Sequence, residues 1–182
     1  NCVIAKPSEI TPMSANLLAR TAQEIGFPAG VLNIVQGSGE TAGAALVSHR
    51  GVKAISFTGS TAVGHRIAAT CADQFKKVTL EMGGKNPALV FPDAPAQALK
   101  TLVRSAFQNS GQICLCGSRI LIHRAIYEDF KHAFVSEAER LKIGPPSDPE
   151  TQLGPVMSEP HFRKVLSYIA LAREEGGNIL CG

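Results

Sequence analysis

Short apolar runs and longer segments of helical character alternate along the first half of this chain. The runs at 2–5, 31–35 and 54–57 have the length and composition of strands. A segment of helical character follows each run, over about 12–24, 37–49 and 60–71. Parallel strands need a crossover connection, which is usually a helix. This order therefore predicts an α/β fold with a parallel, doubly wound, Rossmann-like sheet.

The rhythm changes after Gly83-Gly84. We expect strands over 87–91 and 120–122, helices over about 95–109, 126–141 and 159–175, and the start of another strand at 180–182. We therefore predict a domain boundary near 81–84, with residues 1–82 in one α/β domain and residues 83–182 beginning a second. The chain starts at Asn1 inside a strand-like run, so we expect an internal piece of a longer protein.

Composition excludes several classes of partner. The 182 residues are 45% hydrophobic and 18% charged with a net charge of +3, which suits a folded core. No basic block is interleaved with aromatic residues, and no apolar run reaches the length of a membrane span, so neither nucleic acid nor a membrane is expected as a partner. The five cysteines follow no disulfide framework, which is typical of reduced thiols in the cytoplasm.

Cys114 is the candidate nucleophile. It lies in Gly111-Gln112-Ile113-Cys114-Leu115-Cys116-Gly117, between a predicted helix and a predicted strand. Flanking glycines let the backbone approach a ligand, and a cysteine can add to a carbonyl while nearby N–H groups hold the oxyanion. The alternative for any cysteine is a small buried apolar residue. Cys116 has no accompanying His/Cys cluster, so no metal site is predicted.

Glu81 is the candidate general base. It ends the strand-like run Val78-Thr79-Leu80 and precedes Met82-Gly83-Gly84. A carboxylate among apolar residues would have a raised proton affinity, which suits a base. A plain strand-end charge is the other interpretation.

Two short segments suit a nucleotide. Gly59-Ser60 and Gly64 follow a strand and open a helix, where free N–H groups favour a phosphate, although Ser60 is equally an ordinary N-cap. Lys6 and Glu9 follow the first strand at the end where open α/β sheets bind ligands. They suit the two ribose hydroxyls of an adenosine, and a solvated turn is the alternative.

Together these segments resemble the aldehyde dehydrogenase superfamily over essentially the whole chain. The matching motifs come in the family's order: Lys6-Pro7-Ser8-Glu9, Phe57-Thr58-Gly59-Ser60, Glu81-Met82-Gly83-Gly84-Lys85-Asn86-Pro87 and Gly111-Gln112-Ile113-Cys114. Gly154-Pro155 also matches, and we assign it and Asn86-Pro87 structural roles. The residues after the candidate nucleophile, Leu115-Cys116, resemble those at the same place in the branch that acts on 2-aminomuconic and 2-hydroxymuconic semialdehydes.

The resemblance implies a role for each candidate. Cys114 is the nucleophile and Glu81 the base. Lys6 and Glu9 contact the adenosine ribose of NAD, with Glu9 disfavouring the 2′-phosphate of NADP. Ser60 meets the pyrophosphate, and Gly59 and Gly64 give clearance. Residues 1–82 then become part of an NAD-binding domain, and residues 83–182 part of a catalytic domain.

The resemblance also implies an activity and leaves alternatives open. It predicts oxidation of an aldehyde to the carboxylic acid through a thiohemiacetal and a thioester on the cysteine, by a homo-oligomer when the protein is full length. The family's oxyanion-hole asparagine and nicotinamide-ribose glutamate are not among these residues, so the 182-residue chain by itself is expected to be inactive. A CoA-acylating relative and a non-catalytic protein on the same fold are the competing interpretations.

Overall fold

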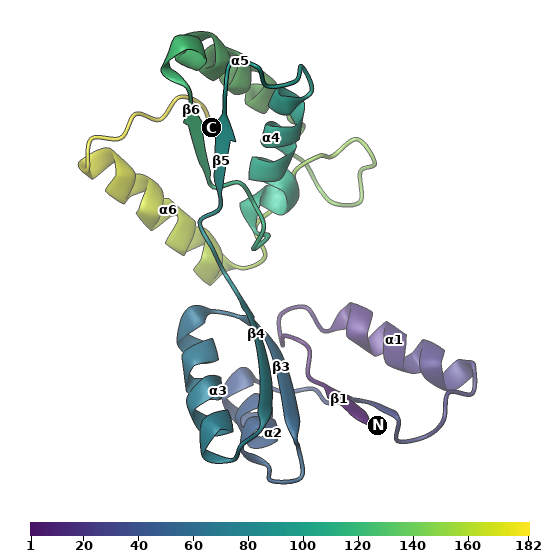
Figure 1. The fold of residues 1–182 in the computed structure, drawn as a ribbon. Helices are drawn as coiled ribbons and strands as arrows, with labels where there is room; N and C mark the ends of the chain where they lie inside the picture. The colour runs from purple at the N-terminus through teal and green to yellow at the C-terminus, as the bar shows by residue number, and fades with distance from the viewer. The chain divides into compact units, whose positions relative to one another are not determined.

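The computed structural model describes residues 1–182, which form two compact units, Asn1–Met82 and Gly83–Gly182. The first unit contains two parallel strand pairs and the second contains one, and in each pair a helix connects the strands, as Figure 1 shows. The predicted α/β class with parallel strands is confirmed.

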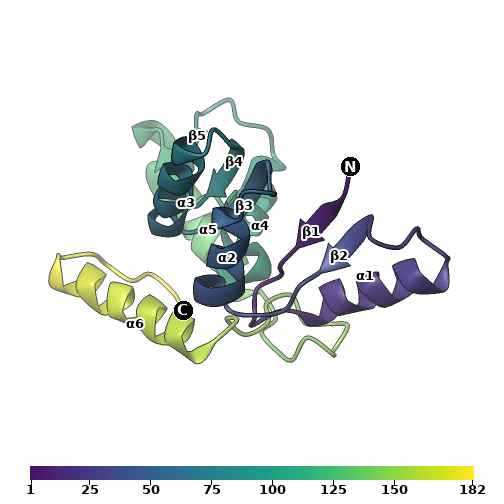
Figure 2. The ribbon, with the colours of Figure 1, turned by 90° about the horizontal axis from the view of Figure 1, so that it is seen from below.

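The first unit contains two strand pairs. β1 (Val3–Ala5) pairs with β2 (Leu32–Ile34) through the crossover helix α1 (Met13–Glu24), which lies along β2 (Figure 2). A π-helical turn, η1 (Gly39–Gly43), leads into α2 (Ala44–Ser48). β3 (Ala54–Gly59) then pairs with β4 (Lys77–Met82) through α3 (Thr61–Asp73).

The second unit has one strand pair flanked by helices. β5 (Pro87–Val90) pairs with β6 (Arg119–Ile122), and α4 (Ala98–Phe107) and the short η2 (Gln108–Gly111) connect them. After η3 (Arg124–Ile126), α5 (Tyr127–Glu139) packs on α4, with the rings of Phe107 and Phe134 6.0 Å apart. The last helix is α6 (Glu159–Glu174).

The core of each unit is small. The buried apolar residues are Ile67, Cys71, Val90, Val103 and Cys116. Every strand pairs only with its crossover partner, so the six strands make three two-stranded sheets within this chain. Many large apolar side chains stay exposed in consequence, because two-stranded sheets with a few short helices cannot enclose a full core.

Two expected boundaries differ from the observed ones. The helix expected from residue 95 begins at Ala98, and residues 180–182 form no strand. A strand exists only where its backbone groups find a partner, and the apolar run at 179–181 has none here. None of the helices combines the length and apolar character that a membrane span requires.

Candidate active site

The side chains of Lys6 and Glu9 join the turns that follow β1 and β2. Lys6 Nζ lies 3.3 Å from Glu9 Oε2 and donates to the carbonyls of Pro7 at 2.6 Å and Gly37 at 2.8 Å. The Gly39 N–H donates to Glu9 Oε1 at 3.5 Å. Both predicted ribose contacts therefore lie together at the carboxyl ends of a parallel strand pair, where open α/β sheets bind ligands.

An open hollow of about 380 Å³ lies beside this ion pair. It is lined by Glu9, Pro12, Met13, Asn16, Gln36 and Gly37. The pKa of the Glu9 carboxyl lies below its usual 4.5, because its own backbone N–H, the Lys6 ammonium and the Gly39 N–H all donate to it. Glu9 is therefore a carboxylate at neutral pH, at the rim of a cavity with room for part of a nucleotide.

Ser60 caps the helix α3. Its Oγ accepts a hydrogen bond from the Val63 N–H at 3.3 Å, the geometry of an N-cap. The earlier N–H groups, those of Thr61 and Ala62, face no acceptor in the preceding turn of helix, as at every helix start. The capping and phosphate interpretations of this segment are thus compatible: the hydroxyl is used within the helix and the backbone N–H groups remain for an anion.

Gly64 is buried where α3 crosses β4. A Cβ atom at this position would lie 2.5 Å from the Sδ atom of Met82. The clearance that Gly64 gives is therefore between helix and strand. Gly59 has a comparable constraint, because a Cβ there would meet the ring of Phe57.

Glu81 lies on β4, in register with Thr58 of β3. Its strand ends beside the start of α3, so Glu81 and Ser60 occupy the same end of the β3·β4 pair. The side chain of Glu81 is exposed. The apolar enclosure expected from its sequence neighbours is therefore absent in the first unit, because Leu80 and Met82 point to the other face of the strand.

Cys114 lies on a tight turn in the second unit, with its side chain exposed. The turn is closed by the Cys116 N–H, which donates to the Ile113 carbonyl at 3.0 Å. Asn86 Nδ2 reaches the same turn from the residue before β5 and donates to the carbonyls of Cys114 at 2.7 Å and Cys116 at 3.1 Å. Cys116, in contrast, is buried and packs as a small apolar residue, which is the alternative role for any cysteine.

A left-handed turn precedes the cysteine. Asn109, Ser110 and Gly111 have φ values of 53°, 55° and 73°. Left-handed residues other than glycine are rare and cluster at functional sites, where neighbouring contacts hold them. Here a second loop supplies the contacts: Ser110 Oγ donates to the Gly154 carbonyl at 2.6 Å, and the Met157 N–H donates to Gln112 Oε1 at 2.9 Å. The contributions of Ser110 and Gln112 are not evident from the sequence, because each depends on a partner about 45 residues away.

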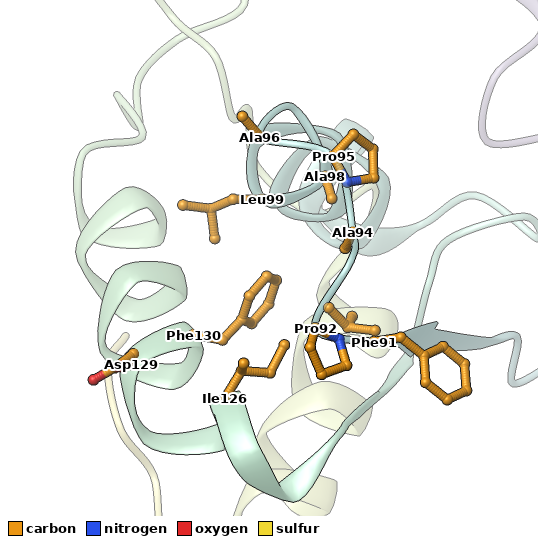
Figure 3. A pocket seen from close by; sticks show the side chains of 11 residues that line it. Phe91, Pro92, Ala94, Pro95, Ala96, Ala98, Leu99, Ile126, Asp129 and Phe130 are labelled. Atoms are coloured by element: carbon orange, nitrogen blue, oxygen red, sulfur yellow. The ribbon is translucent and has the colours of Figure 1, made fainter.

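The second unit has an apolar hollow of about 340 Å³ (Figure 3), and Cys114 is not among the residues that line it. Val90, Leu99, Ile126 and Phe130 are among its walls, so it opens at the carboxyl end of β5. Cys114 is held by Asn86, at the amino end of that strand. This hollow is therefore not a substrate pocket for the Cys114 thiol.

Parallel strand pairs with a capped helix start in one unit, and an exposed cysteine on a braced turn in the other, define an α/β protein. The model of the aldehyde dehydrogenase family matches residues 1–182. The chain belongs to that family.

Similar proteins agree with this membership. The chain is 51% identical to 2-aminomuconic semialdehyde dehydrogenase of Bos taurus, over 100% of its length and 38% of the relative. It is 46% identical to 5-carboxymethyl-2-hydroxymuconate semialdehyde dehydrogenase of Escherichia coli, over 98% of its length and 38% of the relative. The structure of PnpE of Pseudomonas sp. WBC-3 in complex with nicotinamide adenine dinucleotide matches with a TM-score of 0.97 and 44% identity, over 100% of this chain and 38% of that one. The chain thus spans well under half the length of these relatives.

Proposed function

We propose that the complete protein containing this chain oxidises an aldehyde to the carboxylic acid with NAD, using Cys114 as the nucleophile. The observation that carries this proposal is the exposed Cys114 side chain on a turn whose backbone is fixed by Asn86. A mobile thiol would lose the advantage of a pre-set attack geometry. In the proposed division of labour, residues 1–82 bind the cofactor and residues 83–182 carry the nucleophile.

Cys114 performs the covalent step. Its thiolate attacks the carbonyl carbon of the aldehyde and gives a thiohemiacetal, whose oxyanion is held in part by the Cys114 N–H. That N–H makes no hydrogen bond within the chain, so it is free to donate. Loss of the aldehyde hydrogen as hydride leaves a thioester on the sulfur.

The first unit has the residues for the cofactor. Lys6 and Glu9 would hold the adenosine ribose beside the 380 Å³ hollow, and the start of α3, with Gly59, Ser60 and Gly64, would meet the pyrophosphate. The Glu9 carboxylate and the open helix start suit an uncharged ribose edge and an anionic linker. When bound, NAD supplies the hydride acceptor that the oxidation requires.

Glu81 is the proposed base for the second half of the reaction. Its carboxylate removes a proton from the water that attacks the thioester, and the carboxylic acid and free Cys114 result. An exposed side chain at a strand end is able to reach water. Glu81 also favours this hydrolytic reaction over transfer of the acyl group to CoA, for which no base is needed to activate water.

A semialdehyde is the proposed substrate class. Relatives at 51% and 46% identity act, by name, on muconate-type semialdehydes. Leu115-Cys116 after the nucleophile supports the same branch. We also propose a homo-oligomer in the cytoplasm, without nucleic acid or membrane partners. Five free cysteines support a reducing compartment.

The test uses the complete protein with NAD and a panel of aldehydes. The panel includes semialdehydes, which carry a carboxylate at the end opposite the aldehyde. Formation of reduced cofactor and of the acid is measured with and without CoA. We expect CoA-independent oxidation that is lost in Cys114→Ala. A CoA thioester as product supports the acylating alternative, and unchanged turnover by Cys114→Ala refutes the assigned nucleophile. A complete protein that binds NAD but oxidises no aldehyde is a non-catalytic member of the family.

A further inference from the structure

The turn that carries Cys114 is held by one side chain from outside it. Asn86 Nδ2 carries two hydrogens, and two carbonyl oxygens accept from it, those of Cys114 at 2.7 Å and Cys116 at 3.1 Å. The two carbonyls bracket Leu115, a residue that is 78% exposed. One amide group thus fixes the peptide plane after Cys114 and the peptide plane after Cys116.

The Asn86 amide is itself presented by a fixed backbone. Arg119 donates to the Lys85 carbonyl from Nη2 at 2.5 Å and from Nε at 3.0 Å. The Arg119 N–H donates to the Asn86 carbonyl at 3.3 Å. Because β6 begins at Arg119, the residues on both sides of the Asn86 side chain are anchored to the β5·β6 pair.

The other end of the turn is anchored as well. Cys116 is buried, and its Sγ lies 3.7 Å from the Gln108 carbonyl. Cys116 is buried and both carbonyls are directed at Asn86, so the backbone of Cys114 has little remaining freedom although its side chain is exposed. A change at Asn86 would release the turn without touching the sulfur.

We propose that Asn86 is a positioning residue for Cys114. Its amide fixes the Cys114 carbonyl, and through the backbone it sets the direction of the thiol and of the Cys114 N–H. The inference rests on the proposed function. It gives Asn86, for which the sequence suggests only a structural role, a part in orienting the nucleophile. The donor character of the amide is essential, since a carboxylate of the same shape would face two carbonyl oxygens and place a negative charge near the thiolate.

The test compares four variants of the complete protein: Asn86→Asp, Asn86→Ala, Asn86→Ser and Asn33→Asp. Asn33 is a matched control because its Nδ2 also donates to two carbonyls, those of Gly30 at 2.9 Å and Val3 at 3.2 Å, in the other unit. Each variant is assayed for kcat, for KM of the aldehyde, for melting temperature and for the pH dependence of Cys114 alkylation by iodoacetamide. Mass spectrometry of the Cys114 peptide reads the alkylation without any need for turnover.

We expect Asn86→Asp to move the midpoint of alkylation upward by about one pH unit, because it adds a like charge. We expect Asn86→Ala to lower kcat about 10- to 100-fold with little change in KM, because it misplaces the nucleophile. Asn86→Ser keeps one donor and should fall between parent and Ala, and it keeps the test open where a harsher variant fails to fold. Asn33→Asp should leave kcat and the alkylation midpoint within about twofold and a few tenths of a pH unit of the parent.

Two results would overturn the inference. One is that the Asn86 variants keep the parent's kcat and alkylation midpoint. The other is that Asn33→Asp reduces kcat as much as Asn86→Asp at an equal loss of melting temperature, which makes the effect one of stability. Failure of the proposed function is recognised separately, by turnover that survives Cys114→Ala.

Discussion

The Ser110 hydroxyl donates to the Gly154 carbonyl at 2.6 Å, and this bond joins the left-handed turn before Cys114 to a loop about 45 residues later. Ser110→Ala should lower the free energy of unfolding by about 1 kcal/mol, because it removes the bond and keeps the left-handed strain. Ser110→Gly loses the same bond but relieves the strain, so it should lie close to the parent. Chemical denaturation of the complete protein measures both. Equal losses in the two variants would mean that φ strain at Ser110 has no part in the effect.

Glu81→Gln should separate the two halves of the reaction. The amide cannot take a proton from water, so hydrolysis of the thioester should slow about 100-fold or more while acylation of Cys114 continues. Rapid mixing with NAD and aldehyde should then give a burst of reduced cofactor, and intact mass should show an acyl adduct. Glu40→Gln, a change at another exposed carboxylate of the same unit, serves as the control and should leave steady turnover unchanged. If Glu81→Gln abolishes the burst as well as steady turnover, Glu81 does not act in hydrolysis alone.

Glu9→Gln should narrow the preference for NAD over NADP by about tenfold, because it removes the negative charge that, in the proposed site, faces the ribose edge. Titration of both cofactors against the complete protein gives the two Kd values. Their ratio should change mainly through tighter binding of NADP. An unchanged ratio would show that Glu9 does not face the position of the 2′-phosphate.

The same carboxylate predicts how cofactor preference depends on pH. The Glu9 pKa is depressed below 4.5 by its hydrogen-bond donors, so the charge is fully present above that value and is lost only as pH falls through the lower folded pKa. The contribution of Glu9 to folding stability depends on pH in the same way: it is present above 4.5 and is lost as the pH falls through the lower folded pKa. The Kd ratio of the two cofactors should therefore be flat through the neutral range. A change in that range would require a different titrating group.

Gly64→Ala should destabilise the first unit by about 1 kcal/mol, because its Cβ would lie 2.5 Å from Met82 Sδ where α3 crosses β4, and displacing that side chain outweighs the gain in helix propensity. Met82→Ala alone also costs stability, because Met82 is half-buried. The double variant should be more stable than the sum of the two single losses, with a coupling of about 1 kcal/mol measured in a double-mutant cycle. Strict additivity would place the clash elsewhere.

Much of the local structure follows from local sequence. The strand runs at 2–5 and 54–57 and the helix that ends at Glu24 lie within a few residues of their predicted bounds, because apolar periodicity and breakers such as Gly26 act over short distances. The run at the end of the chain was predicted wrongly as a strand for the complementary reason. Its β propensity is local, but a strand needs a partner.

The sequence by itself determined the α/β class, the family and the identity of Cys114, Glu81, Lys6, Glu9, Gly59, Ser60 and Gly64 as candidates, since motif order and residue chemistry are properties of the chain. Only the tertiary structure decided that Lys6 and Glu9 bind Gly37 and Gly39 of the turn after β2, that Glu81 is exposed, and that Asn86 and Gly154 brace the segment around Cys114. Those relationships depend on which groups the folded chain brings within hydrogen-bond distance and which it leaves at the surface. Residue type alone does not carry that information, because one amide or hydroxyl can serve any acceptor that the fold places beside it.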